Sequence, residues 1–151
     1  MNTAKIVIIE DQLIPAYDMR RQLNDLGYKV TGVFTMAEEA LQFLEENLGK
    51  ELFPEVIIAD ISLRGKMNGL EASRQINAKY DCAVIITTGL FNMKEVEEAL
   101  SSRPAFFILK PFDIFYTHIC VQMAIHQQRL EKENAYLKKQ IKILTSDKKT
   151  D

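Results

Sequence analysis

The sequence predicts an α/β fold in which helices cover both faces of an open, parallel β-sheet. Short apolar runs alternate strictly with segments of helical spacing, and this alternation is typical of successive β-α units. The runs are apolar along their whole length, which indicates strands that are buried on both faces. Right-handed crossovers between such strands place helices on both sides of the sheet.

The first half of the chain contains three predicted strands and two helices. A β-branched apolar run at residues 5–9 has the length of a strand. A helix follows at about residues 14–26, because Pro15 suits its first turn and Gly27 its end. The next strand, helix and strand are predicted at residues 28–34, about 36–48 and 55–59.

The second half continues the alternation after a loop rich in Gly and Lys that runs to Gly69. Its elements are a helix at residues 70–79, a strand at 82–87, a helix at 94–102 and a strand at 105–109. Residues from about 113 to 145 have the pattern of one long helix. The chain therefore contains five predicted strands, each followed by a helix.

The composition is that of an ordinary globular protein. Of the 151 residues, 47% are apolar and 26% are charged, which excludes a disordered or collagenous chain. Cys82 and Cys120 lie in apolar stretches without paired spacing, which favours core packing in a reducing compartment. The apolar runs are far shorter than the ~20 residues of a membrane span, and no secretory signal pattern is present. We expect a cytoplasmic protein.

Charge is distributed unevenly along the chain. Residues 1–128 carry 12 basic and 17 acidic side chains, whereas residues 129–151 carry 7 basic and 4 acidic ones. An acidic body disfavours binding to nucleic acid, whose phosphates require a basic surface. We therefore expect no nucleic-acid partner for this body, and only the basic tail leaves a weaker contact open.

Polar side chains follow four of the predicted strands at the points where they end. In open α/β sheets, ligands bind outside the carboxyl ends of the strands, where the strand order reverses. The residues at these positions are Glu10 and Asp11, Asp60, Thr88, and Lys110. Folding would bring three carboxylates, a hydroxyl and an ammonium group together at one edge of the sheet.

Three clustered carboxylates repel one another, so they indicate a bound cation or raised pKa values. Oxygen ligands favour a hard ion, and Mg²⁺ suits a site that is open to water and phosphate. Beside such an ion, Asp60 can act as a nucleophile toward a phosphoryl group, which Lys110 and Thr88 would stabilise. Each residue alone also has an ordinary explanation as a turn, cap, strand end or solvated side chain. Their joint position at four strand ends favours a site.

Four segments, IVIIEDQ, VIIADISL, VIITTG and FFILKPF, resemble in this order the receiver domain of bacterial two-component response regulators. The resemblance covers about residues 4–126. It implies a flavodoxin-like, doubly wound sheet of five strands in the order 2-1-3-4-5. It also implies that Asp60 accepts a phosphoryl group from a histidine kinase or phosphotransfer protein, and that Thr88 and Lys110 bind this group.

The resemblance implies further roles around Asp60. Mg²⁺ would be held by Glu10, Asp11, Asp60 and the backbone carbonyl of Ser62. Phe107 takes the position of the aromatic switch residue, and the bond between Lys110 and Pro111 would be cis. Phe107 replaces the Tyr that is often found there, so it can change its packing but cannot form a hydrogen bond.

The loop after Asp60 departs from the family pattern. Arg64 stands where family members usually carry Pro, and the segment up to Gly69 is one residue longer, with an added Gly65. We expect a different loop shape, which leaves kinase preference and the lifetime of the phosphoryl group open and affects these more than the capacity to be phosphorylated.

Residues 127–151 are predicted to form a helical extension beyond a receiver domain at residues 1–126, with a frayed end. Leucines recur every seven residues, at Leu130, Leu137 and Leu144. The residues three positions before each leucine form the second series of the seam: Gln127, Asn134 and Ile141. Such a seam is typical of a short coiled coil, and Asn134 favours a parallel pair. We expect a parallel homodimer; a solvated or back-packed tail is the alternative.

The leading interpretation is a signalling module that is switched by phosphorylation and catalyses only its own phosphorylation and dephosphorylation. The alternative is a phosphate-independent scaffold or dimerisation module, although a scaffold has no use for mutually repelling carboxylates. A phosphatase with an Asp nucleophile would require a second acid where Ser62 stands. His118 and His126 lack metal-ligand spacing, so we expect surface or interface roles for them. Whether the chain is a stand-alone receiver or the front of a longer protein stays open.

Overall fold

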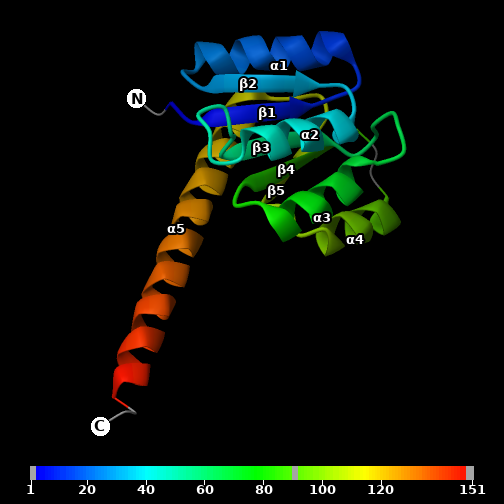
Figure 1. Cartoon of the computed structure of the whole chain (residues 1–151). Coiled ribbons are helices and arrows are strands. Elements are labelled where there is room, and N and C mark those ends of the chain that lie inside the picture. The colour runs from blue at the N-terminus through cyan, green and yellow to red at the C-terminus, as the bar shows by residue number, and fades with distance from the viewer. Residues whose placement is uncertain (1–2, 90–91, 149–151) are drawn as a thin grey trace.

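The computed structural model describes residues 3–89 and 92–148, and within these residues five strands alternate with five helices (Figure 1). The strands are β1 (Lys5–Ile9), β2 (Lys29–Phe34), β3 (Val56–Asp60), β4 (Ala83–Thr88) and β5 (Phe106–Leu109). The helices are α1 (Leu13–Asp25), α2 (Ala37–Asn47), α3 (Gly69–Lys79), α4 (Met93–Ser101) and α5 (Ile114–Asp147). Every predicted element is present, with boundaries that shift by one or two residues.

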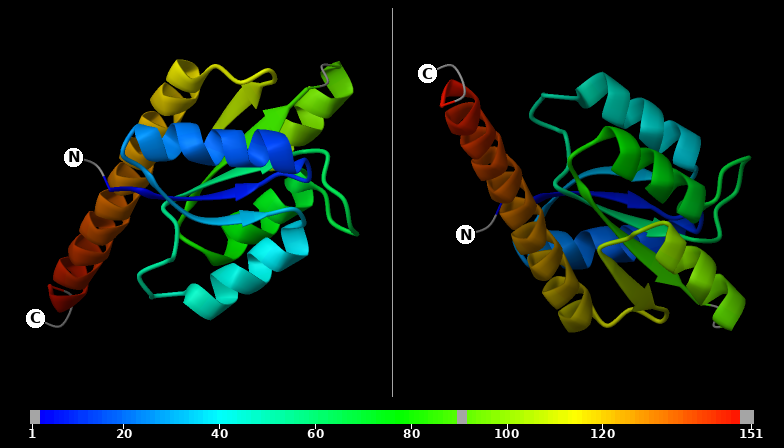
Figure 2. Two further views of the ribbon diagram at one scale, coloured as in Figure 1. Left: turned by 90° about the horizontal axis from the view of Figure 1, so that it is seen from above. Right: turned by 90° about the horizontal axis from the view of Figure 1, so that it is seen from below.

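The strands form one parallel sheet in the order β2-β1-β3-β4-β5, which confirms the predicted flavodoxin-like topology. Helices α1 and α5 cover one face of the sheet, and α2, α3 and α4 cover the other (Figure 2). Successive residues of a strand point to opposite faces. Ile6 and Ile8 accordingly pack under α1 and α5, whereas Val7 and Ile9 pack under the other three helices.

Both cysteines belong to this core. Cys120 packs on the face of α1 and α5, and Cys82 packs on the opposite face. They are buried and unpaired, as the sequence predicts. Burial raises the pKa of the Cys82 thiol to about 12, so this thiol stays protonated and acts as a packing group.

The long helix α5 has two distinct parts. Its buried residues all lie between Thr117 and Ile125, where the helix packs against the sheet. From Arg129 to residue 148, every residue of the described chain is exposed, and the helix projects away from the sheet (Figure 1). Arg129 Nη2 lies 3.6 Å from Glu55 Oε2 and links the projecting part to the start of β3. The last part of the predicted frayed end, residues 149–151, lies outside the described residues.

His118 anchors α5 to the edge of the domain. Its Nδ1 atom lies 2.7 Å from the hydroxyl of Tyr28, which also accepts a hydrogen bond from the Gln122 amide at 2.6 Å. His118 therefore has an internal structural contact that the sequence did not predict. None of the helices in the described chain is long and apolar enough to cross a lipid bilayer.

Candidate functional site

The predicted carboxylates meet at the carboxyl edge of the sheet. Glu10 and Asp11 directly follow β1, and Asp60 is the last residue of the neighbouring strand β3. Each of the three offers an oxygen atom, and these atoms lie within 4.8 Å of one another. Glu10 and Asp60 are only 4% and 5% exposed, so their charges are largely removed from water.

Lys110 joins two of these carboxylates. Its Nζ atom donates hydrogen bonds to Asp60 Oδ2 at 2.6 Å and to Glu10 Oε2 at 3.1 Å. The lysine follows β5, and its peptide bond to Pro111 is cis, as the family resemblance implies. The Lys110 ammonium group therefore stands where it can contact any group that is bound to Asp60.

Backbone hydrogen bonds that continue past the strand ends hold these residues in place. Glu10 N–H donates to Phe34 O at 2.9 Å, and Lys110 N–H donates to Thr88 O at 2.9 Å. Asp60 pairs with Thr87 on β4, and Ile61 N–H donates to Thr87 O at 3.0 Å. The positions of the site residues are thus fixed by the sheet rather than by flexible loops.

The burial of the site is reflected in its pKa values. The pKa of the Glu10 carboxyl is raised to about 7. Burial is the largest cause and the nearby Asp60 carboxylate adds to it, while Lys110 acts in the opposite direction. Burial lowers the pKa of Lys110, but its hydrogen bonds to Asp60 and Glu10 outweigh this, so the pKa lies above its ordinary value. The lysine stays protonated and offsets only part of the negative charge of three carboxylates.

The donor set suits Mg²⁺. Three carboxylate oxygens face one another, and when all three groups are ionised the Lys110 ammonium and the exposed Arg64 guanidinium, 3.7 Å from Asp11, still leave the cluster with net negative charge. A hard divalent ion would balance the remainder, and Mg²⁺ is usually held by a few carboxylates with water completing its shell. Ser62 follows Asp60 by two residues, and its N–H donates to Asp60 Oδ1 at 3.2 Å. The predicted role of its carbonyl as a ligand remains a prediction.

Thr88 and Phe107 share a cavity beside this site. Thr88 ends β4 and Phe107 lies on β5, where Phe107 is half-buried and packs against the core under α2, α3 and α4. Both line a cavity of about 280 Å³ whose wall also includes Leu100 and Tyr116. The candidate hydroxyl and the candidate switch residue are therefore connected by one space that reaches α5.

Two contacts in the loop after Asp60 were not predicted. Arg64 Nε lies 3.7 Å from Asp11 Oδ2, and Glu38 Oε1 accepts hydrogen bonds from the backbone N–H groups of Lys66 and Met67. Residues as far apart as Glu38 and Met67 show no spacing pattern that could have revealed this contact. For the contact between Arg64 and Asp11, the available signal was the positive charge of Arg64, which lies close in sequence to the predicted nucleophile Asp60.

The sheet topology and the acidic edge with its lysine define a receiver module of two-component signalling. A family model described as response regulator receiver domain matches residues 6–118. The chain belongs to this family of signalling receiver domains. Receivers of this family typically bind Mg²⁺ at an acidic pocket and interact with histidine kinases or phosphotransfer proteins.

Known proteins resemble this chain over most of its length. It is 32% identical over 117 residues to chemotaxis protein CheY of Thermotoga maritima, covering 72% of this chain and 86% of CheY. It is 25% identical over 141 residues to transcriptional regulatory protein PdtaR of Mycobacterium tuberculosis, covering 91% of this chain. The match spans only 66% of the length of PdtaR.

A solved structure shows the same fold. The signal receiver domain of a modulated diguanylate cyclase from Desulfovibrio desulfuricans G20 superposes with a TM-score of 0.78 at 30% identity. The superposition covers 86% of this chain and 99% of that domain.

Proposed function

We propose that this chain is a phosphorylation-switched response regulator, with residues 1–126 as the receiver and residues 127–151 as a dimerising extension. Asp60 accepts a phosphoryl group from a histidine kinase or a phosphotransfer protein. The contact between Lys110 Nζ and Asp60 Oδ2 at 2.6 Å, inside a buried acidic cluster, supports this function most strongly.

The phosphoryl transfer forms one bond and breaks another. A carboxylate oxygen of Asp60 attacks the phosphorus of the donor phosphohistidine, and the P–N bond breaks with its electron pair going to the imidazole. The Lys110 ammonium neutralises charge on the phosphoryl oxygens, and the Thr88 hydroxyl donates a hydrogen bond to one of them. Glu10, Asp11, Asp60 and the Ser62 carbonyl would hold Mg²⁺, which supplies further positive charge.

The switch acts through the cavity that Thr88 and Phe107 share. A hydrogen bond from Thr88 to the phosphoryl group would move one wall of this cavity. Phe107 then repacks, and the change reaches Tyr116 at the start of α5. Small changes of packing can be transmitted in this way because a close-packed interior has a few discrete arrangements.

A direct test uses the whole chain, Mg²⁺ and a small phosphodonor such as phosphoramidate. We expect intact-mass measurement to show the addition of one phosphoryl group. A phosphate-independent scaffold, the alternative function, predicts no addition under the same conditions.

Removal of one proposed metal ligand should abolish Mg²⁺ binding. We expect wild-type Mg²⁺ affinity on the order of millimolar, because the ion keeps much of its water shell. Asp11→Ala should show no saturable change when Mg²⁺ titration is followed by backbone amide NMR. Asp18→Ala, which removes a carboxylate of α1 that pairs with Arg21, is the matched control and should bind as wild type does. Undiminished binding by Asp11→Ala would place the site elsewhere.

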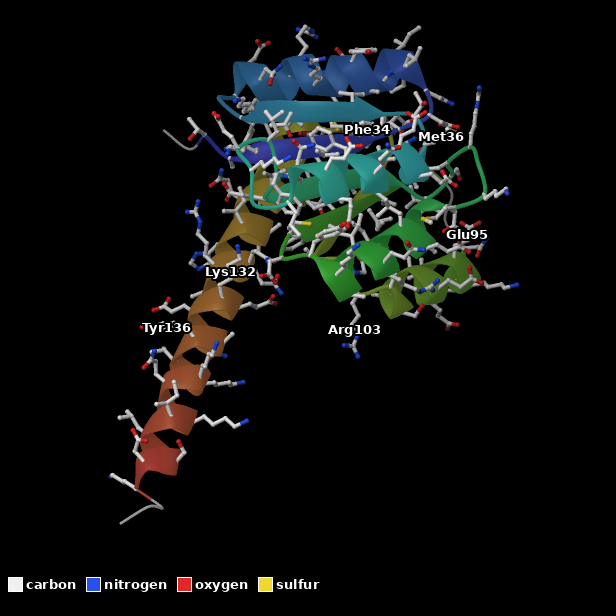
Figure 3. The ribbon with its side chains drawn as sticks, viewed as in Figure 1. Phe34, Met36, Glu95, Arg103, Lys132 and Tyr136 are labelled. Carbon is white, nitrogen blue, oxygen red and sulfur yellow. The ribbon has the colours of Figure 1, made fainter. Side chains whose placement is uncertain are left out.

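The exposed apolar residues of α5 support the proposed dimer. Leu130, Leu137, Ile141 and Leu144 are each at least half exposed in a single chain. The seven-residue series continues upstream through Met123 and Tyr116, which are also about half exposed, so one stripe runs from the Phe107 cavity into the extension. Figure 3 shows Tyr136 on the stretch of α5 that projects beyond the sheet. A second copy would remove this stripe from water.

We expect a homodimer by light scattering, with a dissociation constant that changes on phosphorylation. Truncation after residue 126, or the double substitution Leu130→Lys and Leu137→Lys, should give a monomer that still accepts phosphate, because neither change touches the site. Exchange of Lys132 and Lys139 by Gln is the control, because each lies two residues after a seam leucine, on the face of the helix that points away from the seam. A monomeric full-length chain, or a truncated chain that stays dimeric, would exclude the seam as the interface.

A further inference from the structure

The loop between β3 and α3 is fastened to the start of α2 by Glu38. Glu38 Oε1 accepts hydrogen bonds from Lys66 N–H at 3.0 Å and from Met67 N–H at 2.9 Å. Gly65 has a φ of +99°, a conformation that glycine adopts without strain. A Cβ atom at this position would lie 3.0 Å from Glu38 Oε2, so the added glycine lets the loop approach the carboxylate closely.

A backbone contact strengthens this attachment. Arg64 forms an isolated parallel β-bridge with Met36, the residue directly before α2. Met36 is labelled in Figure 3, next to the start of α2. The Glu38 carboxylate accepts hydrogen bonds from the backbone N–H groups of Glu38 itself, Met67 and Lys66. These bonds lower the pKa of Glu38, so the carboxylate is charged at neutral pH. The loop is therefore held on both sides of Gly65.

The attachment places the Arg64 side chain beside the acidic cluster. Arg64 Nε lies 3.7 Å from Asp11 Oδ2. The arginine side chain is 80% exposed, whereas the aspartate side chain is 18% exposed. Lys110 contacts the other two carboxylates, Glu10 and Asp60, from within the fold. Each of the three acidic residues thus has a cationic neighbour, and Asp11 has its own from the loop.

We propose that Arg64 is a tethered counter-ion that competes with Mg²⁺ for Asp11, and that Glu38 positions it. This inference rests on the proposed Mg²⁺ site. Metal binding requires the Asp11 oxygen to exchange the guanidinium for the ion, so the arginine raises the Mg²⁺ concentration at which the site fills. An exposed ion pair is weak, and its loss corresponds to a change of about two- to fivefold in affinity.

Arg64→Gln tests the competition because it removes the charge and keeps much of the side chain. We expect full-length Arg64→Gln to bind Mg²⁺ about two to five times more tightly than wild type, in titrations followed by backbone amide NMR. Lys66→Gln is the matched control, since it removes one positive charge from the same loop and leaves the backbone N–H groups in place. Equal tightening in both variants would show a general charge effect and overturn the role of Arg64.

A pair of substitutions tests whether Glu38 positions the arginine. Glu38→Gln and Glu38→Ala both remove the charge, but only glutamine keeps an oxygen that can accept from Lys66 and Met67. We expect Glu38→Ala to bind Mg²⁺ more tightly than Glu38→Gln, because the loop and Arg64 are released. The difference should vanish when Arg64→Gln is added, since coupled residues are not additive. A difference that persists would overturn the positioning role.

A spectroscopic readout separates this inference from the proposed function. The Arg64 Nε–H signal of wild type should shift as Mg²⁺ saturates the site, because the contact with Asp11 is lost. Wild type that shows no saturable Mg²⁺ response overturns both the metal site and the competition. Wild type that binds Mg²⁺, together with Arg64→Gln of unchanged affinity, overturns the competition alone.

Discussion

Replacement of Asp60 by asparagine is expected to abolish phosphorylation completely. Asparagine keeps the shape of the side chain and an oxygen that can accept from Ser62 N–H, but it lacks the carboxylate that we propose as the nucleophile toward phosphorus. Asp60 is also the carboxylate that Lys110 contacts most closely, at 2.6 Å. After incubation with Mg²⁺ and phosphoramidate, wild type should gain one phosphoryl group by intact mass, and Asp60→Asn should gain none.

Asp113→Asn provides the control for this experiment. Asp113 caps the start of α5 by accepting hydrogen bonds from Phe115 N–H and Tyr116 N–H, and asparagine is also a good capping residue. This variant should be labelled as wild type is. Equal labelling of wild type and Asp60→Asn would show that another residue is the acceptor.

Gly69→Ala is expected to destabilise the fold strongly and to disturb the site. A Cβ atom on Gly69 would lie 1.9 Å from the backbone oxygen of Asp60 and 2.7 Å from its carbonyl carbon. Gly69 begins α3, and its N–H donates to Ile61 O at 3.0 Å, so the helix cannot move away without losing this bond. We expect a loss of about 3 kcal/mol in the free energy of unfolding, at the upper end for an overpacked position.

Urea denaturation measures this loss, and phosphodonor labelling measures the effect on Asp60. Gly89→Ala is the control, because its Cβ would lie 3.7 Å from Lys110 Cδ, an ordinary contact. That variant should change the unfolding free energy by no more than about 0.5 kcal/mol, as surface substitutions usually do. Wild-type stability in Gly69→Ala would show that β3 and α3 separate more easily than their close approach indicates.

The buried acidic cluster argues against the scaffold alternative. Burial and the neighbouring Asp60 raise the pKa of Glu10 to about 7, which means that the fold disfavours the charged form. A protein that needed only the receiver shape would be more stable with apolar side chains at Glu10 and Asp60, which are almost fully buried. The cluster is best understood as a binding site for positive charge.

The elements and the candidate site could be predicted because they depend on local pattern. Strands such as β3 are apolar on both faces, and residues that directly follow parallel strands must lie at the same edge of the sheet. Glu10, Asp60 and Lys110 could therefore be brought together from their positions after the apolar runs. The strand order itself came from the family resemblance, since alternation alone does not determine which strands are neighbours.

The contacts around this site depend on packing between elements that are distant in sequence. The spacing of the sequence does not show that Lys110 bridges Glu10 and Asp60, or that Glu38 holds the loop that places Arg64 beside Asp11. Periodicity reports which face of an element is buried, because it repeats within that element. A contact between a loop and a distant helix depends instead on how both pack against the rest of the fold. Local pattern is enough to predict which residues form the site, whereas packing sets which cation faces each carboxylate.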